Sequence, residues 1–318
     1  MPTIKTALKL AFTLGLLAWA FSRLDWSRLQ GSWELFESKY LFLAAVFLFL
    51  SIYLAALRWS SFLKLISMDG NKQAETGLYF YGALLNQGLP TTMGGDAYKA
   101  IKKSKAPLWK EKIKLQDVFK NNKLELFTAH FIVILIDRLY GLIGVLLIGL
   151  FAIFLRSDTY GYNLIVISYI SSFCLLLFMF CPKKLLERLT VTPWVRTYKT
   201  LDLTLLLLKE THVFLVAMKE FLRAILIHVL GAAAMFFCFK AVGMAISLEA
   251  LGLSYAIANC LVVLPISIAG WGVRETSLIS ILSIWHYDTN TIVIGSLLFG
   301  IISIGALLPG LYFLKFND

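Results

Sequence analysis

Two short segments of the sequence place a cation a few residues after a proline and a glycine. Residues 89–99 read LPTTMGGDAYK and residues 264–274 read LPISIAGWGVR, so both fit L-P-x-[ST]-x-x-G-x-x-x-[KR] at an offset of 175 residues. Free backbone amides at a helix start attract anions, and lysine or arginine brings a full positive charge to the same place. We therefore predict a site for a phosphate-bearing ligand, formed by Lys99, Arg274, Arg138, Gly94, Gly95 and Gly270.

The same two segments are expected to interrupt a helix. Proline removes an amide donor and glycine lets the chain turn, so Pro90 and Pro265 mark the breaks. Irregular backbone at membrane depth survives only when it is buried in protein or lines a wet cavity. We predict two re-entrant hairpins, over 75–100 and 248–286, related as an internal repeat and entering the membrane from opposite sides. The alternative is a pair of kinked helices packed for structural reasons.

A second group of charges lies inside an apolar segment. Asp137 and Arg138 are near the middle of the run 124–155, where a charge costs about 3 kcal/mol and is usually paired or functional. Adjacent helical residues point about 100° apart, so each of the two needs another partner. The predicted polar path or ion network consists of Arg58, Asp96, Asp137 and Glu275. Two alternatives are a purely structural network and an Arg58 side chain that extends to the lipid headgroups.

The sequence carries no pattern for a metal, a nucleotide or another cofactor. The histidines have no metal-ligand spacing, the cysteines have no CxxC spacing, and neither G-x-S-x-G nor a Gly-rich phosphate loop occurs. We therefore expect no metal and no cofactor. The net charge of +11 does not indicate nucleic acid, because nine lysines and two acids in residues 99–123 account for +7 of it.

The elements that would position these residues are membrane-spanning helices. Of the 318 residues, 59% are hydrophobic and 15% are charged, and the apolar residues fall in blocks of about twenty, the length that crosses a bilayer. We predict an all-α polytopic membrane protein that forms one transmembrane domain over 1–318. Besides the two hairpins we expect about six full spans, over residues 4–22, 41–66, 124–155, 162–181, 221–242 and 291–314.

Charge orients these helices relative to the membrane. Residues 99–123 form a basic loop of the kind that marks the cytoplasmic face. The segment 198–219 alternates apolar clusters with charges, which predicts a helix lying in the interface. If one hairpin enters from each side, the lysine-rich loops all fall on one face. We therefore predict cytoplasmic N- and C-termini, in the cytoplasmic membrane.

Three motifs resemble those of one protein family. LPTTMGGDAYK at 89–99, DRLYGL at 137–142 and LPISIAGWGVRE at 264–275 are similar, in order and spacing, to motifs of the lysylphosphatidylglycerol synthase transmembrane-region family. The resemblance covers nearly the whole chain. It implies an inner-membrane protein with a lipid-accessible cavity bounded by re-entrant helices and, for some members, movement of phospholipids between leaflets. Because the sequence contains no soluble aminoacyltransferase domain, we expect that it does not make lysyl-phosphatidylglycerol.

Three functions are compatible with these observations. The leading hypothesis is a flippase or scramblase, not an enzyme, for a membrane phospholipid or a polyprenyl-phosphate-linked lipid. The second is an intramembrane transferase that acts on a lipid-linked substrate with Asp96 or Asp137 as the base. The third is a non-catalytic partner of a lipid-modifying synthase or glycosyltransferase. A homo-oligomer is compatible with each of them.

Overall fold

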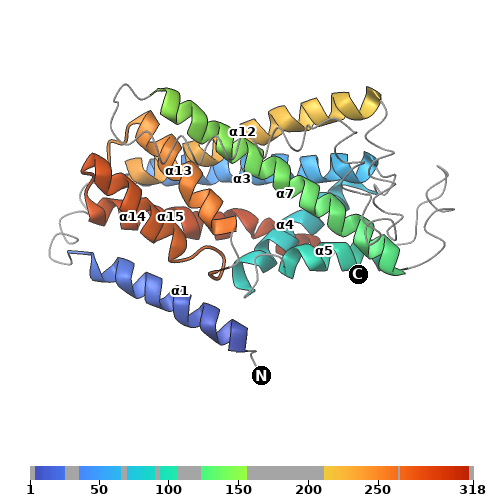
Figure 1. The fold of residues 1–318 in the computed structure, drawn as a ribbon, viewed down its shortest axis with the longest axis horizontal. Coiled ribbons are helices and arrows are strands. Elements are labelled where there is room, and N and C mark those ends of the chain that lie inside the picture. The colour runs from blue at the N-terminus through green and yellow to red at the C-terminus, as the bar shows by residue number, and fades with distance from the viewer. Residues whose placement is uncertain are drawn as a thin grey trace, which may run out of the picture.

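The computed structural model describes residues 4–25, 36–65, 70–89, 94–105, 123–155, 211–263 and 266–314. Within these ranges every regular element is a helix (Figure 1). Four helical segments are long and apolar enough to cross a membrane, namely Ser38–Leu65, Val133–Phe154, Leu215–Ala241 and Thr289–Tyr312. They correspond to four of the predicted spans, so the described part of the chain is an all-helical, multi-pass membrane protein.

The described helices form two groups, separated in the sequence by residues 156–210. The first group contains α1 (Ile4–Ser22), α3 (Ser38–Leu65), α4 (Lys72–Gly88), α5 (Gly94–Lys105) and α7 (Lys123–Phe154). The second group contains α12 (Thr211–Ala241), α13 (Leu248–Val263), α14 (Val273–Leu282), α15 (Thr289–Leu307) and α16 (Pro309–Leu314). The predicted span 4–22 corresponds to α1, and the predicted span 162–181 lies outside the described residues.

α3 and α12 pack side by side over much of their length. Small side chains are buried in the hydrophobic core that the two helices share, among them Ala44 of α3 with Ala232 and Ala234 of α12. Small residues let membrane helices approach closely. Ser51 Oγ of α3 donates a hydrogen bond to Ile227 O of α12 at 3.1 Å. Close packing and this interhelical hydrogen bond together hold the pair.

The internal repeat extends beyond the two motifs. Adding the offset of 175 residues to α4 (72–88) gives 247–263, which coincides with α13. The same addition carries α3 (38–65) to 213–240, within α12. In Figure 1, α4 and α5 lie in the right half of the molecule and α13 and α14 in the left half, while α3 and α12 run in opposite directions. The helices α3, α4 and α5 therefore follow one another in the same order as α12, α13 and α14, and α3 runs in the direction opposite to α12.

Glycine shapes both helix pairs, α4 with α5 and α13 with α14. In the first, a Cβ on Gly95 would lie 1.7 Å from the carbonyl oxygen of Gly82, so only glycine lets α4 and α5 approach this closely. Gly95 N also donates to Asn86 Oδ1 at 2.7 Å. In the second, Gly270 and Gly272 have φ of 80° and 81°, the left-handed region that favours glycine.

α1 contacts the turn that precedes α14. Thr13 Oγ1 accepts a hydrogen bond from Ile268 N at 3.0 Å. Gly272 packs so closely that a Cβ on it would come within 2.6 Å of Leu16 Cβ. Figure 1 shows α1 along one edge of the bundle, and its other faces carry exposed apolar side chains such as Leu8 and Leu14. This exposure is expected of a helix in contact with lipid.

Several predicted features lie outside the described residues. These are the breaks at Pro90 and Pro265, most of the basic loop 99–123 and the first part of the predicted interfacial helix 198–219. α12 runs without interruption from Thr211 to Ala241. Residues 211–219 therefore belong to the same helix as the predicted span 221–242.

Candidate functional site

Asp96 is the centre of a charged cluster at the start of α5. Its Oδ1 pairs with Lys99 Nζ at 2.8 Å, and its Oδ2 pairs with Arg138 Nη2 at 2.5 Å and Nε at 2.6 Å. Asp96 lies in the first turn of α5, where the helix dipole favours a negative charge. Only 2% of Asp96 is exposed, so the two cations compensate the cost of burying this acid.

Lys99 is enclosed by the protein. Its side chain is 5% exposed, and Nζ lies 4.5 Å from the ring centre of Tyr79 and 5.3 Å from that of Trp59. The cation–π contacts and Asp96 therefore engage the charge of Lys99 inside the protein. Arg138 is the more open cation, with 31% of its side chain exposed. Arg138 is therefore the member of this cluster that the protein covers least.

Arg58 and Asp137 form a buried pair between α3 and α7. Arg58 Nε lies 2.6 Å from Asp137 Oδ1, and the two side chains are 5% and 7% exposed. Asp137 thus holds the guanidinium in the interior, which overturns the alternative that Arg58 extends to the headgroups. Although Asp137 and Arg138 are adjacent in sequence, the first bonds a residue of α3 and the second a residue of α5.

Glu75 is a buried carboxylate that was not among the predicted site residues. It is 1% exposed and accepts hydrogen bonds from Ser60 Oγ at 2.5 Å, Lys103 Nζ at 2.6 Å and Gly70 N at 2.6 Å. These contacts connect the start of α4 to α3 and to the end of α5. The signal available in the sequence was a lone acid in the first turn of a mostly apolar helix.

Glu220 is a second buried carboxylate outside the predicted site. It lies on α12, is 0% exposed, and its Oε2 pairs with Arg223 Nη1 at 2.5 Å. Arg223 Nη1 also donates to Ser61 Oγ of α3 at 3.3 Å. The signal in the sequence was an acid followed three residues later by a cation, a spacing that places both on one helix face.

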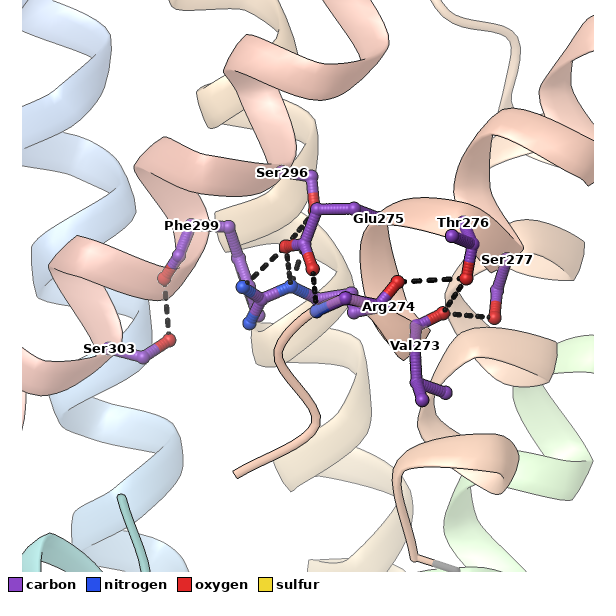
Figure 2. Close-up of polar contacts among 9 residues, drawn as sticks. Val273, Arg274, Glu275, Thr276, Ser277, Ser296, Phe299 and Ser303 are labelled. Carbon is purple, nitrogen blue, oxygen red and sulfur yellow. Dashed lines mark hydrogen bonds and ion pairs between the residues drawn. The ribbon is translucent and has the colours of Figure 1, made fainter. Parts of the chain in front are cut away.

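Arg274 and Glu275 form a local cluster at the start of α14. Arg274 donates to Glu275 Oε1 from Nη2 at 2.8 Å and from Nε at 3.1 Å. Ser296 Oγ of α15 donates to the same oxygen at 2.9 Å, and Gly272 N donates to Oε2 at 2.7 Å. Figure 2 shows the Glu275 carboxylate between Arg274 and Ser296. Both of its oxygens are therefore hydrogen-bonded, although the side chain is buried.

The guanidinium of Arg274 is fixed on one edge only. Its Cζ lies 5.0 Å from the ring centre of Trp271 and 5.6 Å from that of Phe299. Nε and Nη2 are used by Glu275 and Ser296, whereas Nη1 bonds none of the residues that the structure describes. Arginine binds a phosphate or carboxylate through such a free nitrogen. Arg274 is thus held in place through Nε and Nη2, and its Nη1 group has no partner among the described residues.

The predicted site residues fall into two groups. The first gathers among α3, α5 and α7 and consists of Arg58, Asp96, Lys99, Asp137 and Arg138, with Gly94 and Gly95 at the start of α5. The second consists of Arg274 and Glu275, with Gly270 in the preceding turn. Within the described ranges, no three His, Cys, Asp or Glu side chains are placed to hold a metal ion.

The fold and the site together define a class: a multi-pass helical membrane protein with charged residues buried at the starts of α5 and α14. The chain belongs to the family described as the lysylphosphatidylglycerol synthase TM region, whose family model matches residues 6–310. The family expected from the three motifs is therefore confirmed, and it indicates a membrane role related to lipids. No curated protein matches the sequence.

Proposed function

We propose that the protein moves a phospholipid, or another phosphate-bearing lipid such as a polyprenyl phosphate, between the leaflets of the cytoplasmic membrane. The excess of positive charge in the first cluster carries this proposal. Three cations, Arg58, Lys99 and Arg138, share the two acids Asp96 and Asp137, which leaves one positive charge among the five residues. Such an excess charge favours a counter-ion, and arginine, as in the partly exposed Arg138, binds phosphate through two parallel hydrogen bonds.

The two hairpins support a route across the membrane. In transporters built from inverted repeats, half-helices entering from opposite sides meet at a site near the midplane. Here Arg138 bonds the start of α5, and Arg274 lies at the start of α14, so each hairpin has an arginine beside its second helix. The phosphate would pass between these two arginines, while Asp96 and Glu275 hold them and the acyl chains stay in lipid.

The ion pairs disfavour the alternative of a transferase. A general base needs a carboxylate that can accept a proton from the substrate. Asp96 bonds two cations and Asp137 bonds Arg58, so the charge of each acid is already compensated inside the protein. We therefore assign Asp96 and Asp137 to the support of the cations.

Lipid movement in proteoliposomes tests the proposal. The purified protein is placed in phosphatidylcholine vesicles with fluorescent phosphatidylglycerol, phosphatidylethanolamine or polyprenyl phosphate, and an impermeant quencher reports the label in each leaflet. Wild type is compared with Arg138→Ala, Arg274→Ala and, as a control, Lys64→Ala at the exposed end of α3. A hydrogen bond to a charged group contributes about 1.5–3 kcal/mol, so each arginine variant should move the lipid at least about tenfold more slowly.

The melting temperature in detergent separates loss of folding from loss of transport. Arg138→Lys is a further comparison, because lysine keeps the charge beside Asp96 but removes the two-nitrogen fork. An unchanged rate in folded Arg138→Ala and Arg274→Ala would refute the assignment of these residues. A product of altered mass without lipid movement would favour the transferase, and co-purification with a synthase together with insensitivity to both changes would favour a non-catalytic partner.

A further inference from the structure

Glu220 Oε1 is the one buried carboxylate oxygen without a hydrogen-bond partner among the described residues. The other oxygen of the same group pairs with Arg223. By contrast, Glu75, Asp96 and Glu275 each have both oxygens bonded. An unsatisfied buried acceptor costs about 1–3 kcal/mol, and more when it is charged. Protonation of Glu220 would remove the part of this cost that comes from the negative charge.

Arg58 supplies the complementary unsatisfied donor. Its Nε bonds Asp137, but its Nη1 is buried with no partner among the described residues. Arg58 lies on α3 and Glu220 on α12, and these two helices pack against each other. Ser61, one turn after Arg58 on α3, accepts a hydrogen bond at 3.3 Å from Arg223, which is the partner of Glu220. A donor and an acceptor that lack partners therefore lie in the same charged region of the interior.

The other groups around Glu220 come from three helices. They are Lys219 and Arg223 on α12, Ser61 and Arg58 on α3, and Tyr140 on α7. Lys219 is exposed, and the Ser61 hydroxyl donates its proton to Leu57 O at 3.0 Å. The Ser61 proton is therefore not available to Glu220, which leaves Oε1 without a donor among the described residues.

We propose that Glu220 is the proton-binding group that couples lipid movement to proton movement across the membrane. When a proton binds Oε1, the carboxylate becomes a neutral acid and Arg58 stays with Asp137, as in the arrangement described above. When that proton leaves to water, the anionic Oε1 attracts Nη1 of Arg58 and weakens the Arg58–Asp137 pair. The inference rests on the proposed lipid movement and names what drives it.

The coupling reaches the phosphate site through α7. Asp137 immediately precedes Arg138, so a change in the partner of Asp137 shifts the helix segment that carries Arg138. Arg138 in turn bonds Asp96 at the start of α5. Gain or loss of one proton at Glu220 thereby changes how firmly the first hairpin holds its more open cation.

A pH gradient across proteoliposomes tests this coupling. Vesicles of phosphatidylethanolamine and phosphatidylglycerol with fluorescent phosphatidylglycerol receive a gradient of either sign. In wild type, we expect the probe to accumulate in one leaflet and to reverse when the gradient is reversed. Glu220→Gln is permanently neutral, so exchange should continue while the accumulation is lost. Glu249→Gln, which removes a carboxylate from the first turn of α13, is the matched control and should behave as wild type.

Two further measurements separate coupling from folding. Glu220→Gln leaves Arg223 without its partner, so the double variant Glu220→Gln/Arg223→Gln removes both charges and should show the same loss of accumulation. Infrared difference spectra between acid and alkaline protein should contain the carbonyl stretch of a neutral carboxylic acid that is absent from Glu220→Gln. This second readout requires no transport.

The outcomes distinguish the inference from the proposed function. Gradient-independent exchange in wild type, or accumulation that persists in Glu220→Gln, would overturn proton coupling and leave the lipid movement standing. If wild type moves no probe, the proposed function fails and the infrared spectra alone decide on the proton site. A wild-type spectrum without the Glu220 carboxylic acid signal would overturn that site as well.

Discussion

In the first hairpin, the helix pair α4 and α5, Asp96 bonds Lys99 on its own helix and Arg138 on α7. One carboxylate therefore joins this helix pair to a long membrane helix. In the second hairpin, the helix pair α13 and α14, Arg274 bonds the adjacent Glu275. Glu275 also accepts a hydrogen bond from the hydroxyl of Ser296 on α15. The repeat thus places a cation at the same position of both hairpins, but it connects these cations to the rest of the protein differently.

This difference separates support from binding. The first cluster joins α3, α5 and α7 through two buried acids, so its charges are part of the helix packing. The second cluster is nearly self-contained and keeps one arginine nitrogen without a described partner. Changes in the first hairpin should therefore affect stability more than the matched changes in the second.

The largest effect is expected from neutralising the two acids. Asp96→Asn leaves Lys99 and Arg138 without their shared counter-ion and should lower the free energy of unfolding by about 3–5 kcal/mol. Glu275→Gln keeps one acceptor oxygen, which can serve either Gly272 N or Ser296 Oγ but not both, and should cost about 1.5–3 kcal/mol. Denaturant titration in detergent measures both. Equal losses, or a larger loss in Glu275→Gln, would contradict the distinction between the hairpins.

A smaller effect is expected from the glycines that the repeat matches. A Cβ on Gly95 meets backbone, 1.7 Å from Gly82 O, so Gly95→Ala forces α4 and α5 apart and should cost about 3 kcal/mol. A Cβ on Gly270 meets the Val262 side chain at 2.6 Å, which can rotate, and the remaining strain comes from φ of 80°. Gly270→Ala should therefore cost about 1–2 kcal/mol.

Gly88→Ala is the control for both glycine changes. Gly88 ends α4, and nothing lies within 4 Å of a Cβ built there, so alanine should change the free energy of unfolding by less than about 0.5 kcal/mol. Melting curves of the three variants rank them directly. A Gly95→Ala protein as stable as the Gly88→Ala protein would show that the close approach of α4 and α5 is not required.

The long spans were accessible from the sequence because they depend on local properties. Apolar length indicated Ser38–Leu65 and Val133–Phe154, and the offset between LPTTMGGDAYK and LPISIAGWGVR predicted two matched breaks. α4 ends at Gly88 and α5 begins at Gly94, and the predicted break at Pro90 lies outside the described residues between them. Length and periodicity require no knowledge of which helices become neighbours.

The partners of the charges were not accessible in the same way. Arg58 and Asp96 belonged to the predicted ion network, but which of its members pairs with Asp137 or Arg138 depends on how α3, α5 and α7 pack. Lys99 begins a lysine-rich run and therefore resembles a solvated residue, yet Asp96 and two aromatic rings enclose it. Glu220 gave only a weak local signal, because its unsatisfied oxygen arises from burial between helices.

The smallest effect is expected at the contact between α1 and the second hairpin. Thr13 Oγ1 accepts from Ile268 N, so Thr13→Val removes the acceptor and should lower the free energy of unfolding by about 1 kcal/mol. Loss of about 1 kcal/mol corresponds to about fivefold faster exchange of the Ile268 amide hydrogen. Thr13→Ser keeps the hydroxyl and should exchange at the wild-type rate. If the second cluster is self-contained, a change at Thr13 should not reach the first hairpin. Faster amide hydrogen exchange in α5 of Thr13→Val would therefore mean that the two hairpins are not independent.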